Sequence, residues 1–233
     1  EPMDDLVDPI AAELHERWKL THFADRGEGS PRWKAPESET WETRARAELE
    51  AAGVKEQGNK RINDEGEVEI DIAHTDYEDL TAHWQANNKA AAQDGAKSLL
   101  RALDRGVTVE QLQRALTEAM DMVEADRTLD ETFAQRSTAH RAVVDAGILI
   151  HDGWFEREGE WAPEDQKQPF LRLSAINQKR DLDILQLSIE KYLGQISPDA
   201  FLAEEPSIDI SLDEVPARLA ELTAQISATD SDE

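Results

Sequence analysis

The 233-residue chain contains no cysteine, which excludes disulfide bonds, thiolate nucleophiles and cysteine-ligated metal sites. It also lacks any run of about 18 apolar residues, so the sequence predicts no transmembrane helix. The stretch Glu1–Asp5 has neither the basic nor the apolar character of a signal peptide. Together these absences favour a cytoplasmic protein that does not bind membranes.

Basic residues are scarce as well. Lys and Arg number 25 against 51 Asp and Glu, which gives a formal net charge of −26. A surface this acidic repels nucleic acid and anionic membranes at long range, so we expect no nucleic-acid partner. Two interpretations of the charge stay open: it serves solubility alone, or it attracts a basic protein partner.

Sequence signatures of catalysis are missing too. The chain has no Gly-x-Ser-x-Gly, no glycine-rich phosphate loop and no dinucleotide fingerprint. The six histidines are scattered, without the spacing that metal ligands on one helix face require. The sequence therefore predicts a protein that is not an enzyme and that has no cofactor and no metal site.

What the chain does contain is one pattern used twice. Residues 14–18 read Leu-His-x-x-Trp, and residues 77–88 follow with Tyr, Leu and Gln-x-x-Asn; residues 150–154 and 170–181 repeat this order with Ile-His-x-x-Trp, Phe, Leu and Gln-x-x-Asp. From the aromatic residue onward the copies match without a gap, at an offset of about 93 residues, and a tandem repeat sets domain count and architecture together. The first copy holds roughly 43 additional residues between its two halves.

Helical periodicity dominates the rest of the chain. Thr108 and Gln111 form a capping box before a helix that reaches about residue 125. A short helix is expected over 40–52, a strand over 68–72 and a loop over 53–66. The predicted fold class is α+β and predominantly helical, with a few short strands beside each His-x-x-Trp helix.

The second copy resembles the ryanodine-receptor repeat (RyR) domain. The likeness rests on Ile150-His151-Asp152-x-Trp154, then Gln168-Pro169-Phe170-x-x-Leu173, then Asn177-Gln178-x-x-Asp181. Gln168 replaces a family histidine and Asn177-Gln178 replaces Glu-Lys, and the first copy departs further. The chain is also similar to small actinobacterial and phage proteins, which share Pro31-Arg32-x-Lys34, Asp71-Ile72-Ala73 and Trp84-Gln85-x-x-Asn88.

The resemblance implies a non-enzymatic α+β module in two copies with approximate two-fold symmetry. In that family a repeat pair forms a cleft that holds an adenine nucleotide or a drug-like ligand. The expected divisions are 1–106 for the first repeat, with an insertion at about 19–66, then 107–195 for a linker helix and the second repeat, and 196–233 for an acidic C-terminal segment.

Aromatic and basic residues near the repeated motifs make a candidate site for a small anionic or nucleotide-like ligand. Several alternatives stay open: the histidines bond backbone carbonyls, the tryptophans cover the core, and the cations pair with nearby glutamates. The alternative function is an acidic, DNA-mimicking protein that binds a basic partner. The candidate ligand-binding residues are His15, Arg32, Trp33, Lys34, Tyr77, His151, Trp161, Lys167, Phe170 and Arg172.

Overall fold

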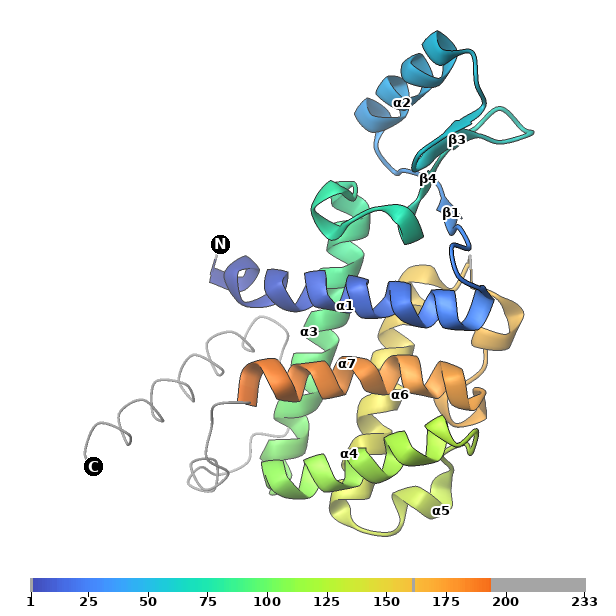
Figure 1. The fold of residues 1–233 in the computed structure, drawn as a ribbon. Helices are drawn as coiled ribbons and strands as arrows, with labels where there is room; N and C mark the ends of the chain where they lie inside the picture. The colour runs from blue at the N-terminus through green and yellow to red at the C-terminus, as the bar shows by residue number, and fades with distance from the viewer. Residues whose placement is uncertain (1, 161, 194–233) are drawn as a thin grey trace. The chain divides into compact units, whose positions relative to one another are not determined.

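The computed structural model describes residues 2–160 and 162–193 (Figure 1). Within these ranges the chain is predominantly helical with one four-stranded antiparallel sheet, which confirms the predicted fold class at this level. The α-helices are α1 (Pro2–Arg26), α2 (Glu39–Ala52), α3 (Ala82–Asp104), α4 (Val109–Glu124), α5 (Glu131–Ala134), α6 (Thr138–Glu158) and α7 (Ala175–Leu193). The strands are β1 (Trp33–Lys34), β2 (Glu56–Gln57), β3 (Lys60–Ile62) and β4 (Val68–Asp71), and the 3-10 turns are η1 (Ile72–His74), η2 (Tyr77–Asp79), η3 (Glu164–Gln166) and η4 (Phe170–Arg172).

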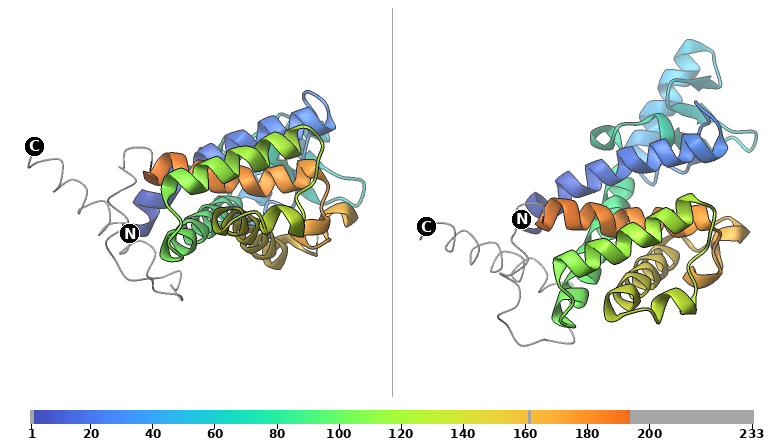
Figure 2. Two further views of the ribbon diagram at one scale, coloured as in Figure 1. Left: turned by 90° about the horizontal axis from the view of Figure 1, so that it is seen from below. Right: turned by 60° about the horizontal axis from the view of Figure 1, so that its bottom comes forward.

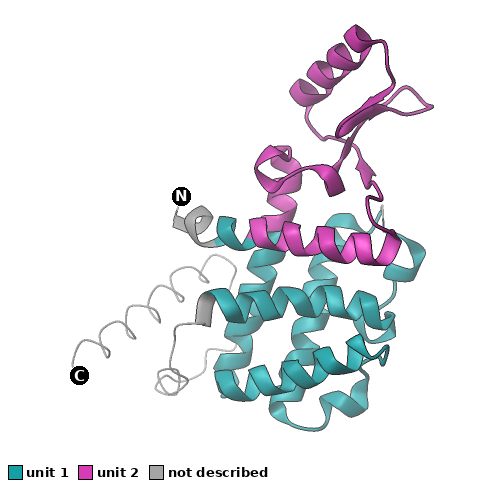
Figure 3. Cartoon of the chain, viewed as in Figure 1, with its two compact units in different colours: residues 1–10, 90–233 teal, residues 11–89 magenta. Residues whose placement is uncertain are grey.

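The chain divides into two compact units (Figure 3). Unit 1 comprises residues 1–10 and 90–233, and unit 2 comprises residues 11–89. Helices α1 and α3 each contribute residues to both units, so the unit boundaries differ from the division expected after residue 106. The predicted acidic segment 196–233 lies outside the described residues.

Unit 2 contains the sheet, whose strands lie in the order β1-β4-β3-β2. Strand β4 follows the predicted alternation over residues 68–70, with Val68 and Ile70 buried, but the next residue, Asp71, is buried as well. The expectation of a loop over 53–66 is wrong, because this segment contains β2 and β3. Strand β2 is polar and β3 has a single apolar residue, Ile62, so neither shows an apolar alternation that predicts a strand. The turn between them includes Gly58, whose φ of 61° is a conformation that glycine adopts without a steric penalty.

Helix α2 packs on β3 and β4, within the segment expected to be an insertion. It begins after Ser38, whose hydroxyl accepts a hydrogen bond from a first-turn backbone N–H, and it ends at Gly53 in the left-handed conformation. Of residues 40–57, only Ala45 and Leu49 are buried. The core of unit 2 is formed by Ala11, Ile70, Ile72, Tyr77, Leu80 and Trp84, with Ala12, Trp18 and Trp41 packed against it.

Unit 1 is a helical bundle in which α4, α6 and α7 pack against one another and α5 packs on α6. Figure 2 shows α4 and α7 side by side. The predicted capping box opens α4: the Thr108 hydroxyl accepts from the Gln111 N–H and the Gln111 side chain accepts from the Thr108 N–H, both at 3.1 Å. Unit 1 has no strand among its described residues, so the strands expected beside the second His-x-x-Trp helix are not found there.

The core of unit 1 surrounds the Phe170 ring. A Cβ atom at Gly147 on α6 would lie 2.3 Å from the ring carbon Cζ of Phe170, a distance that real Cβ atoms do not reach. Glycine at this position therefore allows α6 to lie directly against the ring. The largest fully buried side chains of this core are Leu99, Leu112, Leu116, Leu129, Phe133, Ile150, Phe170 and Leu182.

Candidate functional site

The two histidines of the repeated motif make the same contacts, each within its own unit. Nε2 of His15 lies 2.7 Å from the carbonyl oxygen of Thr75, and Nε2 of His151 lies 2.8 Å from that of Gln168. A carbonyl only accepts, so each Nε2 carries a proton and donates it. Both imidazoles stack on the tryptophan three residues later, with ring centroids 5.8 and 5.7 Å apart. The histidines thus hold the loop that precedes the repeated aromatic residue.

The turn that follows is also the same in both copies. The N–H of Leu80 donates to the Tyr77 carbonyl at 3.2 Å, and the N–H of Leu173 donates to the Phe170 carbonyl at 3.1 Å. The glutamine five residues further on donates from Nε2 to the same carbonyl oxygen, at 3.1 Å in each copy. Helices α3 and α7 begin at matching positions of the two motifs.

One difference between the copies affects the protonation of the motif histidine: the second copy has Asp181 where the first has Asn88. In the second copy Nδ1 of His151 lies 3.2 Å from Oδ2 of Asp181, and both side chains are buried. In the first copy the matching residue is Asn88, whose amide donates to the Trp84 carbonyl at 2.9 Å. His151 therefore has acceptors at both ring nitrogens, which favours the doubly protonated imidazolium.

Burial and charge act differently on the two histidines. Burial lowers the pKa of His15 below its ordinary value, despite the bond to the Thr75 carbonyl. Burial acts in the same direction on His151, but the Asp181 carboxylate and the Gln168 carbonyl outweigh it and raise the pKa of His151. Burial in turn raises the pKa of Asp181, and the nearby imidazolium opposes this.

The aromatic candidates occupy structural positions. Tyr77 and Phe170 are only 9% and 1% exposed, so their rings pack in the cores and leave no face for a ligand to stack on. The Trp33 ring is covered by the guanidinium of Arg61, whose Cζ lies 4.5 Å from the ring centroid. Trp161 lies outside the described residues. The expected role of the first two rings in ligand binding is thus replaced by core packing.

Three of the four basic candidates make contacts within their own unit, Arg32 through its backbone. The backbone N–H of Arg32 donates to Oδ1 of Asp71 at 2.8 Å. Nζ of Lys34 lies 5.5 Å from the Trp84 ring centroid, a cation–π distance. Lys167 pairs with Glu164 at 2.7 Å, as the local-pairing alternative predicts, and Arg172 is exposed. Arg32, Trp33 and Lys34 lie together at β1. The two histidines, His15 and His151, instead donate hydrogen bonds to the loop carbonyls described above.

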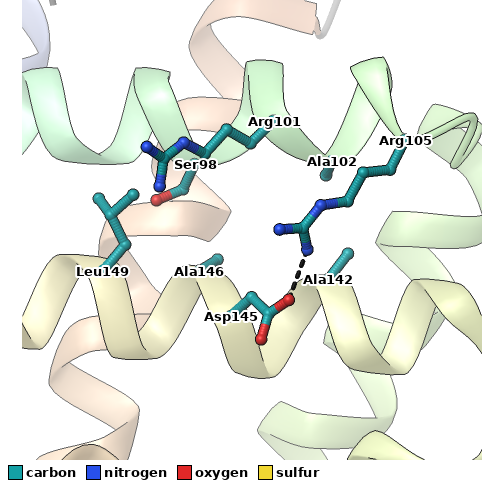
Figure 4. A pocket seen from close by; sticks show the side chains of 8 residues that line it. All are labelled: Ser98, Arg101, Ala102, Arg105, Ala142, Asp145, Ala146 and Leu149. Carbon is teal, nitrogen blue, oxygen red and sulfur yellow. Dashed lines mark hydrogen bonds and ion pairs between the residues drawn. The ribbon is translucent and has the colours of Figure 1, made fainter. Parts of the chain in front are cut away.

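A different cluster emerges in unit 1, in a small hollow between α3 and α6 (Figure 4). The two arginines of this α3–α6 hollow are Arg101 on α3 and Arg105, which directly follows the last residue of α3. The Arg105 N–H donates to the Arg101 carbonyl at 3.2 Å, so both residues lie on one face of this last turn. Opposite them, Asp145 on α6 forms an ion pair with Arg105. The lining residues are Ser98, Arg101, Ala102, Arg105, Ala142, Asp145, Ala146 and Leu149.

Arg101 differs from Arg105 because one of its buried nitrogen atoms has no hydrogen-bond partner among the described residues. Its Nε is buried, and among the residues that the structure describes it makes no hydrogen bond. The side chain as a whole is half-buried. The hollow thus contains two cationic groups and one carboxylate, a local excess of positive charge in a chain of net charge −26.

Sequence reasoning did not find this cluster. Arg101 on α3 and Arg105 just after it lie far in sequence from Asp145 on α6, and only the tertiary structure brings them together. The available signal was the i, i+4 arginine pair in a chain where basic residues are scarce. Alanines at 142 and 146 leave the space between the helices open.

The described part of the chain offers neither a cluster of metal ligands nor a membrane span. Residues 2–160 and 162–193 contain no group of three His, Asp or Glu side chains that could hold a metal ion. None of their helices is long and apolar enough to cross a membrane. Comparison of the chain with protein-family models, with curated proteins and with solved structures found no match.

Proposed function

We propose that this protein is a non-enzymatic recognition module that binds a small anionic ligand in the α3–α6 hollow. The observation that carries the proposal is the buried Nε of Arg101, which has no hydrogen-bond partner in the described part of the chain. A buried donor left without a partner costs about 1–3 kcal/mol. An anion beside this guanidinium supplies the missing acceptor.

The size of the hollow limits what can enter it. Its volume is about 30 Å³, which is room for about two water molecules. The charged end of a ligand fits such a space, whereas a nucleoside does not. A nucleotide-like ligand would therefore place only its phosphate between α3 and α6.

The net charge of the chain does not oppose binding at this point. Charges further away than about 8 Å are largely screened at physiological ionic strength, so the two arginines of the hollow dominate the local potential. Guanidinium groups bind oxyanions through paired N–H donors, which are among the stronger polar contacts in proteins. Asp145 neutralises one of the two cations, and Arg101 supplies the remaining positive charge.

A thermal-shift titration with inorganic phosphate tests the proposal. Wild-type protein should gain stability with phosphate concentration, by about 2.7 kcal/mol when the ligand reaches 100 times Kd. Arg101→Gln should abolish the gain, because it removes the guanidinium and its charge and leaves a shorter, neutral polar side chain. The matched control is Arg127→Gln, which changes an exposed arginine outside the hollow and should respond like the wild type. A wild-type protein that no millimolar anion stabilises would contradict the proposal.

We also infer that the chain holds two copies of one RyR-like unit. Support comes from the matching histidine–carbonyl bonds, the matching turns and the matching glutamine bonds described above. If Asn88 and Asp181 are equivalent, then Asn88→Asp should place a carboxylate near His15 and raise the pKa of that imidazole, which an NMR titration measures. An unchanged His15 pKa would contradict the equivalence. The approximate two-fold symmetry stays a prediction.

Binding of a basic protein partner is the second candidate function, and the net charge of −26 favours it. Attraction between an acidic surface and a cationic protein weakens steeply as salt screens the charges. Polylysine is a suitable probe. Tight, salt-sensitive polylysine binding that Arg101→Gln leaves unchanged, together with no response to small anions, would favour this function over the first.

A further inference from the structure

The polar groups of the α3–α6 hollow include acceptors as well as donors. Ser98 is 3% exposed and lines the hollow one turn from Arg101 on the same helix. Its hydroxyl donates to the backbone carbonyl of Asp94 at 2.8 Å. A hydroxyl has one hydrogen, so the Ser98 oxygen can only accept a further hydrogen bond.

Asp145 offers the second acceptor. Its carboxylate is held by Arg105, and a carboxylate donates no hydrogen bond. Figure 4 shows both acceptors and both arginines around the same space. An anion in the hollow therefore meets two guanidinium donors and two oxygen atoms that accept.

The geometry points to an oxyanion that keeps a proton, and we propose inorganic hydrogen phosphate as the ligand. This inference rests on the function proposed above and narrows it. Hydrogen phosphate accepts hydrogen bonds from the arginines with its bare oxygens and donates its own O–H to Ser98 or Asp145. Sulfate has no proton to donate, so its oxygens would lie against the oxygen of Ser98 or Asp145 without a hydrogen bond.

A phosphate monoester distinguishes the effect of the proton from the effect of the charge, because it can carry the charge of hydrogen phosphate without a proton on its phosphate group. Its second pKa lies near 6, so at about pH 8 a monoester is a dianion without a proton. Inorganic phosphate at that pH is a dianion that retains one proton, and sulfate is a dianion with none. The three anions have the same charge and differ in the ability to donate a hydrogen bond. The hollow should therefore discriminate against nucleotides as well as against sulfate.

Isothermal titration calorimetry of the full chain at about pH 8 tests the inference, with inorganic phosphate, sulfate and methyl phosphate as the probes. Because an unpaired buried acceptor costs about 1–3 kcal/mol, phosphate should bind about tenfold to hundredfold more tightly than the other two anions. Ser98→Ala removes one acceptor and should reduce this preference. Asp145→Asn removes the competing charge on Arg105 and should strengthen binding of all three anions.

Ser188 provides a matched control for Ser98. It is equally buried in a helix and its hydroxyl donates to the carbonyl four residues earlier, also at 2.8 Å, but it does not line the hollow. Ser188→Ala should keep the wild-type preference. Equal affinity of the wild type for phosphate and sulfate, lost in Arg101→Gln, would overturn the proton requirement and leave anion recognition standing. If the wild type binds none of the three anions, both the proton requirement and anion recognition are overturned. This comparison uses only the wild-type protein, so it does not depend on whether a variant folds.

Discussion

Replacement of Asp181 by asparagine should convert the second histidine into a copy of the first. In the folded protein Asp181 lies 3.2 Å from Nδ1 of His151, and their side chains are only 11% and 5% exposed. The substitution preserves shape and removes the negative charge. Burial, which lowers the pKa of His15, then acts on His151 without the opposing carboxylate. The pKa of His151 should therefore fall from above its ordinary value to below it.

The energetic consequence depends on pH. A hydrogen bond to a charged group contributes about 1.5–3 kcal/mol, and both partners are too buried for solvent to screen it strongly. Because the pKa of His151 is raised on folding, its contribution to stability is complete below the unfolded value near 6.5 and disappears as pH rises through the folded value. The pKa of Asp181 is also raised, so the carboxyl becomes neutral in the folded protein at a higher pH than in the unfolded chain. The pair is intact between these two folded pKa values.

Two measurements check this reasoning. NMR titration of the imidazole protons should show the pKa of His151 lowered in Asp181→Asn and that of His15 unchanged, which makes His15 an internal control. Urea unfolding should show a loss of about 1.5–3 kcal/mol at a pH between the two folded pKa values and a smaller loss at a pH above that of His151. A His151 pKa that does not move, or a stability loss that is the same at both pH values, would refute the assignment of the raised pKa to Asp181.

Three further substitutions probe the unit 1 core, and all are measured by urea unfolding. Gly147→Ala places a methyl group 2.3 Å from the Phe170 ring carbon, so it should destabilise the protein by about 1–3 kcal/mol; an unchanged midpoint would mean that α6 shifts freely. Trp154→Ala should destabilise less than Phe170→Ala, for which about 3–5 kcal/mol is expected, because Trp154 is half-buried and Phe170 is 1% exposed. Equal losses would contradict the packing described for these two rings.

The sequence predicted the elements whose signals are local. The capping box at Thr108, the helix over 40–52 and the strand near 68–72 depend on neighbouring residues, and the structure contains all three. Strands β2 and β3 were missed because their stability comes from strand pairing, of β2 with β3 and of β3 with β4, and not from an apolar pattern.

The candidate site was harder to predict for a physical reason. A residue's type does not reveal which way it faces, so the buried rings of Tyr77 and Phe170 had the same sequence signal as ligand-stacking rings. Arg101 and Asp145 come together only through helix packing, and no spacing rule links residues on two helices. The histidine motif was more informative, because its bond to a backbone carbonyl was one of two alternatives the sequence left open.

The central claim is that an anion binds between Arg101 and Arg105. A crystal structure of the protein with arsenate tests it most directly, because arsenate keeps a proton as phosphate does and arsenic scatters anomalously. We predict one anomalous peak in the α3–α6 hollow, within hydrogen-bond distance of the Arg101 guanidinium, and its loss in Arg101→Gln. An empty hollow in wild-type crystals at millimolar arsenate, or a peak that remains in Arg101→Gln, would contradict the claim.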